Sequence, residues 1–205
     1  MDLSLYLVTD RPLSRGRPIE EIVSAAIAGG VTTVQLREKD TPTGEFLELA
    51  LRMRTITRES EVTFIVNDRL DIALASDADG IHVGQDDMPA DVTRRLIGPD
   101  RILGVTAGDS EQARTAIEAG ADYIGCNAVF ATHTKTDTGI PLGLAGLEEL
   151  VRSVDVPVVA IGGINITNAA EVLATGVAGI AVVSAIVAAD DPEKAARELK
   201  HFTER

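Results

Sequence analysis

The amino-acid sequence predicts an α/β fold, a single-domain (β/α)8 TIM barrel that spans residues 1–205. Short apolar segments alternate with segments of helical pattern at intervals of roughly 20 to 30 residues, and eight such units can be counted. No linker or change of composition interrupts the eight units, so one domain is expected. A doubly wound open sheet is the competing architecture, because it is built from the same units.

The predicted strands are short runs rich in Val, Ile and Leu, and most of them end at a polar or glycine-containing turn. They cover residues 3–8, 32–36, 64–66, 80–83, 101–105, 123–126, 156–161 and 179–183. The predicted helices cover residues 18–28, 41–60, 70–75, 90–97, 110–119, 143–154, 167–175 and 192–202. The first helix has Pro18 in its first turn and Gly29-Gly30 after its end, as is typical of helix termini.

Charge and composition exclude several classes of partner. The chain has 32 acidic and 19 basic side chains, a formal net charge of −13, so we expect neither nucleic acid nor an anionic membrane as a partner. The longest apolar run, residues 176–189, is too short to span a membrane and is interpreted as a buried strand. A single cysteine and the absence of a signal-peptide pattern favour a cytoplasmic location. The sequence leaves open whether the chain forms a homo-oligomer.

Acidic side chains follow the third and fourth predicted strands. The third strand leads into Asp68 and the fourth into Asp86 and Asp87, with a helical crossover between them. Such a crossover makes the strands parallel, so their carboxyl ends open on the same face. Two carboxylates from separate strands suit Mg²⁺, which fills its remaining positions with water and phosphate. Taken alone, such acids also cap helices, and that alternative stays open.

Cationic and hydroxyl side chains follow other strands. Gln35, Arg37 and Lys39 alternate, so in an extended chain they point the same way and form a receptor for phosphate. The fifth strand ends at Thr106, whose hydroxyl is a candidate for binding a ligand or for capping the next helix. The loop of residues 127–139 is too long and polar for a simple connection.

Small residues follow the last two strands. Gly163 comes after the seventh strand, and Val183 and Ser184 come at the end of the eighth. In barrels these positions form a recurrent phosphate site, because backbone N–H groups can approach an anion there.

Four reactive side chains are interpreted as structural. His82 lies inside a strand and is predicted to be a buried, hydrogen-bonded imidazole, and Cys126 a small core residue. Glu38 alternates away from the cationic face and is expected in the helix layer or in an ion pair, while His201 is expected on the surface.

Eight short motifs give the chain a resemblance to the thiamine-phosphate synthase family along nearly its whole length. They are, in order, LYLVTD, VQLREK, VNDR, ADGIHVGQDD, ILGVTA, FATHTKTD, AIGGI and VVSAI. Each motif is weak alone, but their order and spacing are specific. The resemblance implies a transferase that joins 4-amino-2-methyl-5-hydroxymethylpyrimidine diphosphate to (carboxy)methylthiazole-ethyl phosphate, with Mg²⁺ as cofactor and diphosphate as the departing group.

The resemblance also implies roles for individual residues. The implied pyrimidine diphosphate contacts are Gln35, Arg37, Lys39, Asn67, Thr106 and Lys135, of which Arg37, Thr106 and Lys135 are the expected catalytic residues. The implied thiazole phosphate contacts are Thr132, Thr134, Gly163, Val183 and Ser184, and the implied metal ligands are Asp68 and Asp87.

The chain departs from the family pattern mainly around the loop after the sixth strand. Asn127, Ala128 and Ala131 stand where the family commonly has Gly, Pro and Pro, and His133 is unexpected, which puts the closure of this loop in doubt. Thr106 stands where the family usually has Ser and keeps the hydroxyl.

Two other functions remain open at this point. One is a related thiazole tautomerase, an isomerase with the same barrel; the joint presence of Arg37, Lys39, Asp68, Asp87 and Lys135 disfavours it. The other is a non-catalytic protein that binds thiamine precursors.

Overall fold

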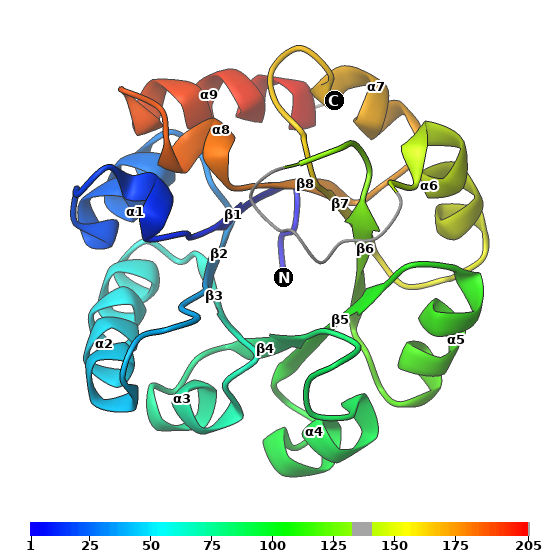
Figure 1. Ribbon diagram of the computed structural model, residues 1–205, viewed down its shortest axis with the longest axis horizontal. Helices are drawn as coiled ribbons and strands as arrows, with labels where there is room; N and C mark the ends of the chain where they lie inside the picture. The colour runs from blue at the N-terminus through cyan, green and yellow to red at the C-terminus, as the bar shows by residue number, and fades with distance from the viewer. Residues whose placement is uncertain (133–140, 205) are drawn as a thin grey trace.

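The computed structural model describes residues 1–132 and 141–204, and the eight strands in these residues form a closed parallel barrel. Each strand pairs with its neighbours in sequence, and the last strand returns to pair with the first. Figure 1 looks down the barrel, with the strands in the middle and the helices in a ring around them. The predicted (β/α)8 barrel is confirmed, and the alternative of an open, doubly wound sheet is wrong.

The strands are four to six residues long. They are β1 Leu5–Val8, β2 Thr33–Leu36, β3 Thr63–Asn67, β4 Gly80–Val83, β5 Ile102–Ala107, β6 Tyr123–Ala128, β7 Val158–Ile161 and β8 Gly179–Val182. The helices are α1 Ile19–Ala28, α2 Thr43–Glu59, α3 Leu70–Ala75, α4 Ala90–Ile97, α5 Ser110–Glu118, α6 Gly143–Arg152, α7 Ala169–Ala174, α8 Ser184–Val187 and α9 Pro192–Thr203, with a 3-10 turn at Pro12–Ser14. In the described residues, every helix falls short of the length and apolar character needed to cross a bilayer.

Most predicted boundaries agree with the structure within a few residues, and those of α3 and α4 agree fully. The 3-10 turn and α8 were not predicted. The interpretation of residues 176–189 as one buried strand is wrong, because the backbone leaves the strand at Val183, with φ −117° and ψ −84°, and begins α8 at Ser184. Apart from the glycines and Ser184 the run is apolar because β8 and most of α8 are buried, and periodicity cannot separate two such short elements.

The strands are apolar on both faces because each face packs against a different layer. Along β1, Leu5 and Leu7 belong to the cluster between the sheet and the helices. Tyr6 and Val8 alternate with them and belong to a second cluster inside the barrel. The barrel interior is therefore a packed core that closes the lower end of any pocket at the strand ends.

Glycines in the strands allow neighbouring strands to approach each other closely. A Cβ atom placed on Gly80 of β4 would lie 2.3 Å from the carbonyl oxygen of Ile102 in β5. Because both atoms belong to paired strands, neither can move away without breaking the sheet. At Gly44, near the start of α2, the corresponding position has no heavy atom within 4 Å apart from the neighbouring residues and the backbone of its own helix.

We predict that Gly80→Ala lowers the free energy of unfolding by about 1–3 kcal/mol, because the added methyl group overpacks the β4–β5 contact. The matched control, Gly44→Ala, is expected to raise it by about 0.4–1 kcal/mol by restricting the unfolded chain. Urea denaturation monitored by circular dichroism measures both changes. Equal stability of the two variants would contradict the close approach of these strands.

Candidate functional site

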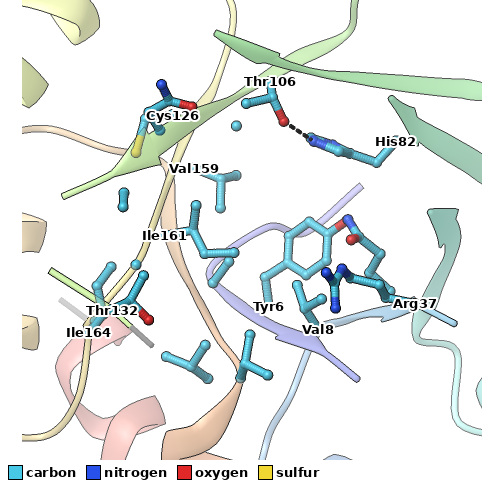
Figure 2. Close-up of a pocket in the computed structure, with 18 of the residues that line it drawn as sticks. Tyr6, Val8, Arg37, His82, Thr106, Cys126, Thr132, Val159, Ile161 and Ile164 are labelled. Carbon is cyan, nitrogen blue, oxygen red and sulfur yellow. Dashed lines mark hydrogen bonds between the residues drawn. The ribbon is translucent and has the colours of Figure 1, made fainter. Parts of the chain in front are cut away.

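A pocket opens at the carboxyl-terminal ends of the strands and gathers residues that lie far apart in the sequence (Figure 2). Residues from all eight strands line it, together with the segments that follow β7 and β8. The predicted site residues that line it are Gln35, Arg37, Asn67, Thr106, Thr132, Gly163, Val183 and Ser184. Closure of the barrel therefore brings most of the predicted residues together.

Arg37 is held in the pocket by a residue that sequence analysis did not single out. Its guanidinium donates a hydrogen bond to Asp10, with Nη1 and Oδ2 3.2 Å apart, and both side chains are largely buried, at 15% and 10% exposure. The Arg37 backbone N–H also donates to the Thr9 hydroxyl at 3.0 Å. Asp10 follows the end of β1 as Asp68 follows the end of β3, and the same strand-end rule would have found it.

The predicted alternation of the cationic face holds for two of its three residues. Gln35 and Arg37 both line the pocket, whereas Lys39 is exposed and is not among the lining residues. Strand β2 ends at Leu36, so the alternation of an extended chain does not extend to Lys39. Glu38 is turned the other way, as predicted, and accepts hydrogen bonds from Arg11 Nε at 2.9 Å and from the Thr41 hydroxyl.

Asp68 and Asp87 follow two strands that are hydrogen-bonded neighbours. Asp68 has a left-handed backbone, φ 61°, and its N–H donates to the His82 carbonyl at 2.8 Å. The Asp87 carboxylate accepts the Gly84 N–H at 2.7 Å and is half-buried, whereas Asp86 is exposed. Among residues 1–132 and 141–204 no group of three or more His, Cys, Asp or Glu side chains is arranged to hold a metal ion. A pair of oxygen ligands is a donor set that fits Mg²⁺ completed by water and phosphate.

The turn after β7 exposes backbone groups at the rim. Gly162 and Gly163 have φ of 98° and 70°, in the left-handed region, and a Cβ on Gly163 would lie 2.8 Å from Phe130 Cβ. Asn168 Nδ2 donates to the Gly163 carbonyl at 3.0 Å, which fixes the turn. Helix α8 starts at Ser184, so its first turn lies directly after β8 at the same end of the barrel. This is the arrangement in which barrels hold a phosphate group.

A chain of hydrogen bonds crosses the bottom of the pocket. Gln35 Nε2 lies 2.8 Å from the Tyr6 hydroxyl, which lies 2.8 Å from the Tyr123 hydroxyl. His82 Nδ1 lies 2.9 Å from the Tyr123 hydroxyl, and His82 Nε2 lies 2.8 Å from Thr106 Oγ1. Figure 2 draws the last of these bonds, with His82 and Thr106 side by side. The prediction that His82 is buried and hydrogen-bonded is confirmed.

Two smaller predictions can be settled at this site. Thr106 does not cap α5, because the Asp109 carboxylate accepts the backbone N–H groups of Glu111 and Gln112 there.

Cys126 is a buried residue, as predicted, although it also lines the pocket. Burial raises the pKa of its thiol to about 12, so the thiol stays protonated near neutral pH and is no nucleophile.

Comparison with known proteins gives the family. The sequence pattern of the family described as thiamine monophosphate synthase matches residues 5–186. The chain is 51% identical over 201 residues to a thiamine-phosphate synthase of Moorella thermoacetica, covering 98% of this chain and 96% of the relative. It is 54% identical over 200 residues to one of Chloroflexus aurantiacus, covering 98% and 92%. The chain belongs to this family.

Solved structures agree with the family assignment. A thiamine phosphate pyrophosphorylase of Pyrococcus furiosus superposes with a TM-score of 0.91 at 46% identity, covering 99% of this chain and 96% of that one. A 3-hexulose-6-phosphate synthase superposes with a TM-score of 0.71 at 18% identity, which shows the fold alone. Membership of the thiamine monophosphate synthase family confirms the resemblance that the eight motifs indicated, and it makes the chain a transferase of thiamine biosynthesis.

Of the residues in which the chain departs from the usual family pattern, Ala128 packs at the base of the loop after β6, Asn127 is half-buried and Ala131 is exposed. Ala128 is buried, and its Cα would lie 2.5 Å from a Cβ placed on Gly162. Phe130 N–H donates to the Gly162 carbonyl at 3.1 Å, and Leu142 N–H donates to the Ala128 carbonyl at 2.9 Å. Both ends of the loop are thus bonded to the barrel. Thr132 lines the pocket, whereas the predicted site residues Thr134 and Lys135, and His133 between Thr132 and Thr134, lie outside the described residues.

Proposed function

We propose that this pocket joins 4-amino-2-methyl-5-hydroxymethylpyrimidine diphosphate to (carboxy)methylthiazole-ethyl phosphate, forming thiamine phosphate and releasing diphosphate. The observation that carries the proposal is the gathering of cationic, amide, hydroxyl and glycine groups from separate strands around one pocket in a chain of this family. Each group matches a chemical need of one of the two substrates.

The reaction needs little proton transfer. The bond between the pyrimidine methylene carbon and the diphosphate oxygen breaks, the methylene carries positive charge, and the thiazole nitrogen supplies the electron pair for the new carbon–nitrogen bond. Catalysis then consists of positioning and of stabilising charge on the departing group. The site is consistent with this chemistry, because both ring nitrogens of His82 already form hydrogen bonds and the Cys126 thiol stays protonated.

Arg37 is the diphosphate anchor in this proposal. Asp10 holds its guanidinium in place before substrate arrives, so less side-chain freedom is lost on binding. Lys39 and Lys135 add positive charge to the same diphosphate, and Asn67 and Thr106 contact the pyrimidine. Asp68 and Asp87 would hold Mg²⁺, which when bound supplies further positive charge at the departing diphosphate.

The thiazole phosphate occupies the opposite rim in this proposal. The left-handed turn at Gly162 and Gly163 and the first turn of α8 at Ser184 offer backbone N–H groups to its phosphate. Thr132 and Thr134 add hydroxyl donors, and Val183 contacts the thiazole side. When Arg37 holds the diphosphate and the opposite rim holds the thiazole phosphate, the thiazole nitrogen is directed toward the pyrimidine methylene.

The direct test is an assay of the purified protein with both substrates and Mg²⁺. We expect diphosphate release that requires the thiazole phosphate and disappears when a chelator removes the metal. Conversion of a thiazole isomer without diphosphate release would support an isomerase instead. Binding of both compounds without any turnover would indicate a non-catalytic binding protein.

The metal proposal is tested by Asp87→Asn against the neighbouring Asp86→Asn. An amide oxygen at position 87 can still accept the Gly84 N–H, so the fold is kept while the carboxylate is lost. We expect the Mg²⁺ concentration for half-maximal rate to rise at least about tenfold in Asp87→Asn. Asp86→Asn, which changes an exposed side chain, is expected to match the unaltered protein. A larger effect at position 86 would assign the metal to the other carboxylate.

Lys135→Ala tests the charge that assists departure of diphosphate. Loss of one preorganised donor typically costs about 10² to 10³ in rate, so turnover at saturating substrates is expected to fall by that factor. The control is Lys194→Ala in α9, whose side chain is 71% exposed and pairs only loosely with Glu198 at 4.0 Å. Unchanged turnover in Lys135→Ala would remove this residue from the catalytic step.

A further inference from the structure

The hydrogen-bonded network Gln35–Tyr6–Tyr123–His82–Thr106 contains three side chains, Tyr6, Tyr123 and His82, that have no role of their own in the reaction proposed above. We propose that it fixes the direction of every proton in it and so makes the Thr106 hydroxyl a hydrogen-bond donor toward the pocket. Tyr6, Tyr123 and His82 are then positioning residues that select a substrate ring with an acceptor nitrogen. This inference rests on the proposed function, because it assumes that the pyrimidine occupies this pocket.

The direction follows from what each group can donate. The Gln35 amide nitrogen donates to Tyr6 and cannot accept, so Tyr123 is the partner in this network that can accept the buried Tyr6 proton. The Tyr123 proton then passes to His82 Nδ1, which acts as an acceptor. A neutral imidazole that accepts at Nδ1 carries its proton on Nε2 and donates it to Thr106. The single Thr106 proton is left to point away from His82.

Burial makes this order strict. Tyr6 and Tyr123 are 1% and 0% exposed, and burial raises the pKa of both hydroxyls above the usual value for tyrosine. Each hydroxyl therefore keeps its single proton throughout the neutral range. In the reversed order Tyr6 would accept from both Gln35 and Tyr123, and its own proton would be left without an acceptor in a buried site, which costs more than it would in water.

Two glycines leave the space that the rings of Tyr123 and His82 occupy. A Cβ on Gly104 would lie 2.1 Å from Tyr123 Cζ, and a Cβ on Gly125 would lie 2.9 Å from His82 Cε1. Side chains are absent from β5 and β6 where the two rings need the space, and the ring centroids lie 5.5 Å apart. The two glycines thus leave space for the rings of Tyr123 and His82. We infer that the ring positions are fixed before substrate binds.

The consequence for recognition is a donor and an acceptor at set places in the pocket. Thr106 offers a proton to a ring nitrogen. The side-chain amide oxygen of Gln35, which takes no part in the hydrogen-bonded network, can accept from an amino group such as that of an aminopyrimidine. A ring with C–H in place of the nitrogen would leave the Thr106 proton unpaired. We expect such an analogue to bind about tenfold to hundredfold more weakly.

The proton order is tested without substrate by ¹⁵N nuclear magnetic resonance of histidine-labelled protein, which has three histidines to assign. We expect His82 to be neutral with its proton on Nε2. Gln35→Glu, recorded at pH 9 beside the unaltered protein, replaces the amide donor with an ionised acceptor, and the His82 proton is expected to move to Nδ1. A proton on Nδ1 in the unaltered protein, or on Nε2 in the variant, would overturn the proposal.

The recognition step is tested by the dissociation constants of the pyrimidine diphosphate and of analogues with each ring nitrogen replaced in turn by C–H. In Tyr123→Phe, which keeps the ring, we expect the preference for the true pyrimidine to fall severalfold while thiazole phosphate binding is unchanged. Equal weakening of pyrimidine and analogues would mean a purely structural role and would refute the proposal. If the unaltered protein bound no pyrimidine, the proposed function would fail, and the proton order would still be decided by the spectrum.

Discussion

The pairing of β8 with β1 is the constraint on which the site depends. In an open sheet these two strands would lie at opposite edges, and the groups that follow them would be separated by the width of the sheet. Closure brings Arg37 and Asp10 on one side and the turn after β7 on the other around one pocket. The packed interior below, with Tyr6 and Val8 in its core, gives the pocket a floor.

The pocket also explains how an acidic chain can handle anionic substrates. The formal charge of −13 describes the whole surface, but charges farther away than about 8 Å are largely screened at physiological ionic strength. At the pocket Asp10 holds the largely buried guanidinium of Arg37 in place, and the glycine turn presents backbone groups that carry no net charge. In the proposed function, what binds therefore depends on the local placement of these groups more than on the overall charge.

Much of the fold and of the rim could be predicted from the sequence because both follow from short-range rules. Apolar periodicity and turn residues located the eight strands, and the strand-end rule located Gln35, Arg37, Asn67 and Thr106. The predictions that failed did so for reasons that also lie in short segments of the chain. The alternation from Gln35 failed at Lys39 because β2 ends first, and α8 was merged with β8 because both are apolar.

The sequence by itself determined the order of strands and helices and which polar residues would stand at the strand ends, since both are set by neighbours along the chain. Only the tertiary structure decided which of those residues face one another. The pair of Asp10 with Arg37 joins β1 to β2, and the chain from Gln35 to Thr106 runs through β1, β2, β4, β5 and β6. Such contacts depend on barrel closure and on the space left by Gly104 and Gly125, which no pattern within a single strand reveals.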